Sequence, residues 1–284
     1  MTPKVSVIVP VYETWHLIPS LVECLQRQTI RPDQFEVILV DNGSSSLNLN
    51  SVPSDYRLLR CEKPGSYSAR NKGAAESRAG IFAFTDSDCL PEPGWLRNLV
   101  RDISDSELRA GAVEIITSGS KPSLIEHYDQ IKGIPQALYV SRGYAATANL
   151  AIPAELFRSL GGFDESRYSG GDADFCRRAL RFGARLTYVA DAVVNHPART
   201  SWSEVVSKAR RVKGGQIKNG SLLRRLLWLF RTLLPPVIEW TRIISCKKAS
   251  VSNRVRALVV ETILWLLHLG ETARLLLGGS PERK

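Results

Sequence analysis

Short apolar runs alternate with helical patterns through the first two hundred residues. Residues 5–10 form a valine-rich run that closes on a proline, and residues 35–40 form a second run that closes on Asp41-Asn42-Gly43-Ser44. Uninterrupted apolar runs of this length predict strands buried on both faces of a parallel sheet. Leucines recur at helical spacing over residues 17–25. This stretch therefore predicts a strand, helix, strand unit of the nucleotide-binding kind.

The alternation continues beyond this unit. A shorter strand pattern at 56–61 precedes a helical pattern at 68–79, and the apolar run 81–84 leads directly into Thr85-Asp86-Ser87-Asp88. We therefore expect an α/β fold with a mostly parallel sheet flanked by helices. Later patterns predict helices at 95–103, 153–160 and 172–182, and strands at 112–116, 147–152 and 186–194.

The pattern changes beyond about residue 221. Over residues 222–234, leucines and a phenylalanine share one side of a helix and three arginines occupy the other, which indicates a strongly amphipathic helix. A second apolar helix is predicted at 255–277. Neither has the run of about 18 uncharged residues expected of a membrane-spanning helix. We expect both helices to lie on a membrane surface, with packing on the rest of the protein or on a second subunit as the alternative.

The basic charge of the chain is concentrated in the same region. The formal net charge is +10, and residues 199–284 hold 17 of the 38 Lys and Arg but only 5 of the 28 acidic residues. A basic amphipathic segment predicts attraction to an anionic membrane surface. Nucleic acid is not an expected partner, because the segment has no recognisable nucleic-acid-binding module and carries leucines between its charges.

Composition limits the class of protein further. With 44% hydrophobic and 23% charged residues, the chain fits one large or two small globular units rather than a disordered chain. Its five dispersed cysteines include no Cys-x-x-Cys pair, so we expect reduced thiols and a cytosolic setting. The first residues show no secretory signal pattern.

Asp86 and Asp88 are the most informative chemical feature. They follow a predicted buried strand, and ligands of open α/β sheets bind at the carboxyl ends of the strands. Paired carboxylates suit hard cations such as Mg²⁺ or Mn²⁺ that bridge phosphates. An Asp-x-Asp triplet alone also occurs by chance on solvated loops, so its meaning depends on the surrounding pattern.

Five motifs occur here in an order and spacing that resemble the inverting family 2 glycosyltransferases, over residues 5 to about 200. The resemblance implies a glycosyltransferase A fold. Residues 1–215 would form the catalytic domain, with a nucleotide-sugar half at 1–100 and an acceptor half at 101–215, followed by a basic membrane-associating tail at 216–284. The motifs are Val5-Ser6-Val7-Ile8-Val9-Pro10-Val11-Tyr12, Val40-Asp41-Asn42-Gly43-Ser44, Ala69-Arg70-Asn71-Lys72-Gly73, Asp86-Ser87-Asp88 and Gly170-Gly171-Asp172-Ala173-Asp174.

The resemblance also implies a site for the nucleotide-sugar donor, formed by residues in and beside the first four motifs. Asp41 would accept the ring N–H of a uracil or guanine, although a structural role in its turn is the alternative. Tyr12 would line the nucleoside pocket or serve as a packing aromatic. Arg70 would bind phosphate or base oxygens, or lie solvated on a helix. The full donor-binding set implied in this way is Pro10, Tyr12, Glu13, Asp41, Asn42, Arg70, Asp86 and Ser87.

The resemblance also implies a metal site. Asp88 would bind the Mn²⁺ or Mg²⁺ ion on the donor diphosphate, while Asp86 would contact the ribose or a metal-bound water. Such an ion stabilises the negative charge that grows on the departing nucleoside diphosphate. His196 follows a predicted strand and would complete this site, or it would be a structural histidine.

Asp172 is the candidate general base, which takes the proton of the acceptor hydroxyl. The family usually has Glu just before this Asp, and here that position is Gly171. Asp174 is therefore the alternative base, although a structural role on the helix is favoured for it. The Gln-x-x-Arg-Trp motif of processive synthases is missing from the sequence, so a single transfer is expected.

Together these expectations describe an inverting, metal-dependent glycosyltransferase. It would move a sugar from a nucleoside-diphosphate donor to a hydroxyl acceptor, in the synthesis of surface polysaccharide or glycolipid. A lipid-linked glycan is one expected acceptor. UDP is the expected nucleotide, with GDP and dTDP left open. The protein would sit on the cytoplasmic face of the membrane as a peripheral or monotopic protein. The alternative is a non-catalytic membrane-bound scaffold that retains the nucleotide-sugar fold.

Overall fold

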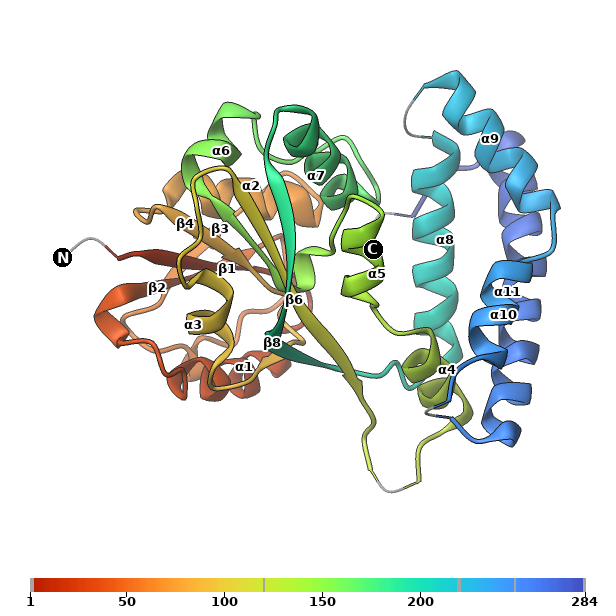
Figure 1. The fold of residues 1–284 in the computed structure, drawn as a ribbon, viewed down its shortest axis with the longest axis horizontal. Helices are drawn as coiled ribbons and strands as arrows, with labels where there is room; N and C mark the ends of the chain where they lie inside the picture. Colours follow the sequence, from red (N-terminus) through yellow and green to blue (C-terminus); the bar gives the residue numbers. More distant parts are fainter. Residues whose placement is uncertain (1–2, 120, 219–220, 248, 283–284) are drawn as a thin grey trace. The chain divides into compact units, whose positions relative to one another are not determined.

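The chain forms two compact units. The computed structural model describes residues 3–119, 121–218, 221–247 and 249–282, whose path is drawn in Figure 1. The first unit comprises residues up to 114 together with 134–165 and 171–196, and the second comprises 115–133, 166–170 and the residues from 197 onward. The expected domain boundary at residue 215 lies inside a helix, α8 (Trp202–Lys218), and the functional division there stays a prediction.

One mixed sheet runs through the fold in the strand order β3-β2-β1-β4-β7-β6-β8-β5. Its β3-β2-β1-β4 half is parallel, whereas β7 pairs antiparallel with both β4 and β6, and β5 pairs antiparallel with β8. The expected α/β fold is thus confirmed, and the parallel pairing lies in the half built from the first motifs. The strands are β1 (Val5–Val11), β2 (Phe35–Asp41), β3 (Arg57–Arg60), β4 (Ile81–Phe84), β5 (Leu90–Pro91), β6 (Glu107–Ile116), β7 (Leu150–Pro153) and β8 (Arg185–Pro197).

The helices divide between the two units. Those of the first unit are α1 (Ile18–Gln26), α2 (Ser66–Glu76), α3 (Trp95–Val100), α5 (Gln136–Ser141), α6 (Ala154–Ser159) and α7 (Gly171–Arg181). Those of the second unit are α4 (Leu124–Lys132), α8 (Trp202–Lys218), α9 (Leu222–Leu233), α10 (Val237–Ile244) and α11 (Val251–Leu276). Short 3-10 turns occur at Trp15–Leu17, Pro32–Gln34, Leu49–Ser51 and Thr147–Asn149.

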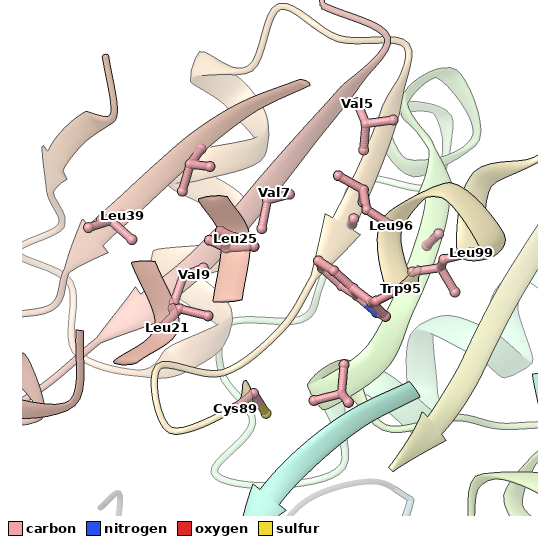
Figure 2. Close-up of a cluster of buried hydrophobic side chains, with 14 of the residues drawn as sticks. Val5, Val7, Val9, Leu21, Leu25, Leu39, Cys89, Trp95, Leu96 and Leu99 are labelled. Atoms are coloured by element: carbon pink, nitrogen blue, oxygen red, sulfur yellow. The ribbon is translucent and has the colours of Figure 1, made fainter. Parts of the chain in front are cut away.

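Alternation along β1 creates the two cores of the first unit. Side chains of a strand point to opposite faces in turn, so Val5, Val7 and Val9 share a face and Ile8 takes the other. The valines join a buried cluster with α1 and α3, and Figure 2 shows this cluster in close-up. Ile8 packs into a second cluster with residues of α2, α6 and α7. Helices therefore cover both faces of the sheet.

A glycine brings α2 unusually close to the sheet. A Cβ atom added at Gly73 would lie 2.5 Å from Cγ2 of Ile8 and 3.1 Å from Cγ2 of Val40. These separations are shorter than normal contacts, so a side chain at residue 73 would push the helix away from β1 and β2. The glycine therefore fixes the position of α2, which carries Arg70.

The second unit encloses a polar group inside a helical core. Tyr128 on α4 donates a 2.6 Å hydrogen bond to Glu261 on α11, and Lys132 Nζ lies 3.0 Å from the same carboxylate. Apolar side chains of α4, α8, α10 and α11 surround this group. The apolar helix expected near 255–277 is thus α11, and one side of it is buried within the unit, while Val255, Val259 and Leu266 stay exposed. Within the part of the chain that the structure describes, no helix is both long and apolar enough to cross a bilayer.

Candidate active site at the carboxyl ends of the strands

The two acidic residues of the Asp-x-Asp motif follow β4 directly. Ligand atoms of Asp86, Asp88 and Cys89 all lie within 4.8 Å of one another. Cys89 is fully buried, and burial, with a smaller contribution from the two neighbouring carboxylates, raises the pKa of its thiol well above the usual value. Cysteine sulfur suits softer metals, whereas carboxylates suit hard cations such as Mg²⁺ and Mn²⁺. The two carboxylates are therefore the ligands that this turn offers.

The structure brings His196 to the same place. The pairing of Leu90 in β5 with Asn195 in β8 carries the end of β8 past the acidic turn, and His196 Nε2 lies 3.4 Å from Asp88 Oδ2. Two carboxylates and one imidazole form a donor set suited to Mn²⁺, whereas Mg²⁺ binds almost wholly through oxygen. These residues fit a divalent cation, and the ligand role of His196 stays a prediction.

Arg70 lies against the acidic turn from the side of α2. Its side chain forms an ion pair with Asp86, although the residue is only 4% exposed. Among the described residues, its buried Nε has no hydrogen-bond partner. A buried donor without an acceptor is rare in folded proteins. The solvated-helix alternative is therefore wrong for Arg70, and its spare donor suits an oxygen of a bound ligand.

Asp41 ends β2 and is almost completely buried. Its carboxylate accepts hydrogen bonds from the indole N–H of Trp15 at 3.1 Å and from the backbone N–H groups of Gly43 at 3.2 Å and Ser44 at 3.3 Å. These contacts are those of the turn-forming alternative, and a role in reading the base stays a prediction. Sequence reasoning missed Trp15, although a buried indole N–H usually needs an acceptor.

The segment after β1 faces the same loops. Tyr12 is 43% exposed, which argues against the packing role, while Pro10 lies within β1 and is partly buried. Glu13 has a φ of 55°, in the left-handed region that non-glycine residues rarely adopt. Its carboxylate accepts two 2.9 Å hydrogen bonds from Ser45, one from the backbone and one from the hydroxyl. Glu13 thus holds the loops after β1 and β2 together.

Asn42 and Ser87 also join neighbouring loops. The Asn42 side chain donates to the carbonyls of Cys61 at 3.0 Å and Lys63 at 2.8 Å. The Ser87 hydroxyl lies 2.7 Å from that of Thr14. The structure therefore brings together the loops that carry the predicted donor residues. Their contact with a nucleotide stays a prediction.

Asp172 lies in the first turn of α7. Its Oδ1 accepts a 2.8 Å hydrogen bond from the Ala173 amide and lies 3.3 Å from the Tyr67 hydroxyl. Burial raises the pKa of this carboxyl group, although the Ala173 hydrogen bond and the Arg70 charge act in the lowering direction. A carboxylate with a raised pKa is a stronger base than an ordinary aspartate. The site thus provides the property that a general base requires.

The neighbours of Asp172 explain two features of its motif. A Cβ atom at Gly171 would lie 2.8 Å from ring carbons of Tyr67, so a side chain at this position has no room beside the ring. Asp174 Oδ2 accepts a 3.0 Å bond from Arg178 Nε, and the same guanidinium donates to the Leu160 carbonyl. Asp174 therefore has the structural contact that the sequence favoured for it. The choice of Asp172 as the base stays a prediction.

The sequence is similar to those of known glycosyltransferases. A family model described as "Glycosyl transferase family 2" matches residues 6–163, more than half of the chain. Glycosyltransferase AglE of Haloferax volcanii is 31% identical over 290 residues, which cover 95% of this chain and 94% of AglE. A pre-mycofactocin glycosyltransferase of Mycobacterium tuberculosis is 28% identical over 217 residues, covering 72% of this chain but only 45% of that protein.

A solved structure supports the fold. The mannosyltransferase PcManGT of Pyrobaculum calidifontis, in complex with GDP-Man and Mn²⁺, superposes with a TM-score of 0.63 at 18% identity. The match covers 97% of this chain and 88% of PcManGT. A likeness at this level of identity establishes the arrangement of strands and helices, and it confirms the fold expected from the sequence.

Proposed function

This chain belongs to glycosyltransferase family 2, and from that premise we propose that it transfers one sugar, with inversion, from a nucleoside-diphosphate sugar to a hydroxyl acceptor. The observation that carries the proposal is the meeting of Asp86, Asp88 and the buried Arg70 beyond the end of β4. Two acids and a guanidinium with a spare donor suit a metal-bound diphosphate.

Asp86, Asp88 and His196 would hold the divalent cation of this site. A bound Mn²⁺ or Mg²⁺ supplies Lewis acidity to the oxygens of the leaving diphosphate. Arg70 would add a positive charge on the same side of the donor, since its side chain already contacts Asp86. Positive groups that are in place before the reaction lower the activation free energy, because they stabilise the negative charge that develops on the departing diphosphate.

The proposed reaction is one in-line displacement. The acceptor oxygen attacks the anomeric carbon from the face opposite the phosphate, and its proton passes to the Asp172 carboxylate. The bond between the anomeric carbon and the phosphate oxygen breaks, and its electron pair leaves with the nucleoside diphosphate. One displacement from the opposite face inverts the anomeric configuration. Burial strengthens Asp172 as a base and so supports this assignment.

The identity of the donor nucleotide is a separate proposal. UDP is our first choice, and GDP and dTDP are the alternatives. PcManGT was solved with GDP-Man, but its likeness to this chain concerns the fold. The donor must therefore be identified by measurement.

The second unit supports a membrane-bound location. On α9, Leu223, Leu227 and Phe230 are each at least 60% exposed, and they share one side of the helix. Arg224 and Arg231 lie outside this apolar stripe. Exposed apolar side chains beside cationic ones suit the boundary between acyl chains and anionic headgroups. We propose that this face docks the protein peripherally on the cytoplasmic leaflet, where a lipid-linked glycan would be the acceptor.

Calorimetric titration of the purified protein with UDP, GDP, dTDP and CMP, with and without Mn²⁺, tests the donor site. Binding of one nucleoside diphosphate that depends on Mn²⁺ and disappears in Asp88→Ala is the expected result. Asp33→Ala, which removes an exposed acid in the turn before β2, is the matched control. Absence of binding for every nucleotide contradicts the proposal. Metal-dependent binding without transfer or hydrolysis of the matching sugar nucleotide favours the scaffold alternative.

A further inference from the structure

Tyr67 belongs to α2, and its side chain contacts the start of α7. It lies in the first turn of α2, is only 8% exposed, and packs its ring against Phe163 with centroids 5.6 Å apart. The guanidinium of Arg70 lies 5.8 Å from the centroid of the same ring. Contacts with an aromatic ring and a cation fix the ring in place.

The hydroxyl end of Tyr67 faces the candidate base. Its oxygen lies 3.3 Å from Oδ1 of Asp172, and since an ionised carboxylate can only accept, the tyrosine is the donor. Burial, with a further contribution from the Asp172 charge, raises the pKa of Tyr67, so its proton stays on the phenol. Oδ1 is therefore held by two donors, the Tyr67 hydroxyl and the Ala173 amide.

The ring of Tyr67 also contacts the start of α7. A Cβ atom at Gly171 would lie 2.8 Å from two ring carbons, so the backbone of α7 touches the ring directly. Asp172 is the next residue along the chain. The position of the Tyr67 ring therefore sets the position of the Asp172 backbone, and with it that of the carboxylate.

We propose that Tyr67 is a positioning residue for the base: its ring sets the start of α7 through Gly171, and its hydroxyl holds the Asp172 carboxylate in its ionised form. This inference rests on the proposed function, in which Asp172 accepts the proton. Tyr67 itself exchanges no proton in the reaction.

Other titratable and charged groups near Asp172 do not supply the same interaction. Arg70 lowers the pKa of Asp172 through its charge and donates no hydrogen bond to that carboxylate in the described contacts. Burial raises the pKa of Tyr144, which precedes β7, and raises that of Cys176 on α7 to about 12. Both groups therefore stay neutral in the working range. The Tyr67 hydroxyl also interacts with the backbone N–H groups of Gly171 and Asp172, so only a pH-dependent effect of its removal reports on the bond to the Asp172 carboxylate.

The pH profile of Tyr67→Phe tests the hydroxyl. This variant keeps the ring and its contact with Arg70, so the donor KM should remain unchanged. Loss of the hydrogen bond to the charged form raises the Asp172 pKa, so the acid limb of kcat should move upward by roughly half to one pH unit. Tyr128→Phe is the matched control, because Tyr128 is also buried and donates to a carboxylate, that of Glu261 in the other unit. An acid limb identical to that of the wild type overturns the proposal.

A second measurement needs no turnover, and so separates this inference from the proposed function. The hydrogen bond favours the ionised carboxylate, so the melting temperature of Tyr67→Phe should fall further below that of the wild type as pH rises from acid to neutral. This pH dependence of the difference in melting temperature should vanish when both proteins also carry Asp172→Asn. A difference that is the same at every pH overturns the role of the hydroxyl, even if transfer is never detected.

A double-mutant cycle tests the ring. Gly171→Ala should lower the melting temperature sharply in the wild-type background, because the new methyl group meets the ring. In a Tyr67→Ala background the same change should cost little. Strictly additive losses overturn the contact between the ring and α7.

Discussion

Arg70 and Asp86 form an ion pair that joins α2 to the acidic turn after β4. The arginine is almost completely buried, whereas Asp86 is about a third exposed. The same guanidinium faces the Tyr67 ring, and its charge acts on Asp172. One side chain therefore links the acids proposed for the donor with the acid proposed for the acceptor.

Replacing Arg70 by Gln should impair both stability and donor binding. The change leaves Asp86 without its cation, and we expect a loss of about 2 kcal/mol in the free energy of unfolding, below the range for fully buried pairs because Asp86 is partly solvated. Nucleotide affinity should fall because the spare Nε donor is lost. Denaturant unfolding and calorimetric titration measure the two effects. Lys72→Gln, which breaks an exposed pair with Glu76 on the same helix, should change neither noticeably.

Asp172→Asn should abolish transfer while leaving donor affinity intact. Removing a general base costs on the order of 10²- to 10⁴-fold in rate. Initial rates and nucleotide titrations of the same preparation separate chemistry from binding. Asp174→Asn should lose some stability through its broken contact with Arg178 but retain turnover. The assignment is wrong if the two variants exchange these behaviours.

The raised pKa of Asp172 gives stability and activity opposite dependences on pH. In the folded protein this group binds a proton more readily than in the unfolded chain, so its contribution to stability falls as pH rises through the folded pKa. Activity needs the ionised form and should rise over that same interval, which lies above the usual aspartate range. Asp172→Asn should therefore melt at a higher temperature than the wild type at neutral pH. A lower melting temperature for this variant at neutral pH contradicts the expectation.

The exposed face of α9 should control membrane binding. Leu226 and Phe230 are both more than half exposed, so replacing both by Glu should leave the fold intact and weaken binding to anionic vesicles by about 100-fold. Vesicle cosedimentation measures the effect. Val255→Glu with Val259→Glu, two equally spaced and similarly exposed positions on α11, is the matched control. Equal losses from both pairs indicate a general charge effect, which contradicts docking through α9.

The sequence predicted the sheet well where apolar runs were uninterrupted. The runs at 5–10, 35–40 and 81–84 correspond to β1, β2 and β4, because strands buried on both faces tolerate few polar residues. Two short helices between 117 and 146 were not predicted. One of them, α4, begins with a capping box between Ser123 and Glu126, a signal that is visible in the sequence.

Contacts between distant segments explain most of what the sequence did not predict. Trp15 and Asp41 are 26 residues apart, and Tyr67 and Asp172 are 105 apart. No local pattern encodes such pairs, because each depends on how the helices pack on the sheet. The tail shows the same limit. Both its apolar helices were expected to lie on a membrane, which stays a prediction. On α9 the leucines are exposed, and α11 packs one side within the second unit while Val255, Val259 and Leu266 stay exposed.

The close contact at Gly73 has a consequence for protein engineering. This residue holds α2 against β1, and Tyr67 and Arg70 on that helix reach the two ends of the proposed site. A single methyl group at position 73 would therefore disturb proton acceptance and donor binding together, from a place that touches no substrate. Libraries intended to change sugar specificity should therefore keep residue 73 constant.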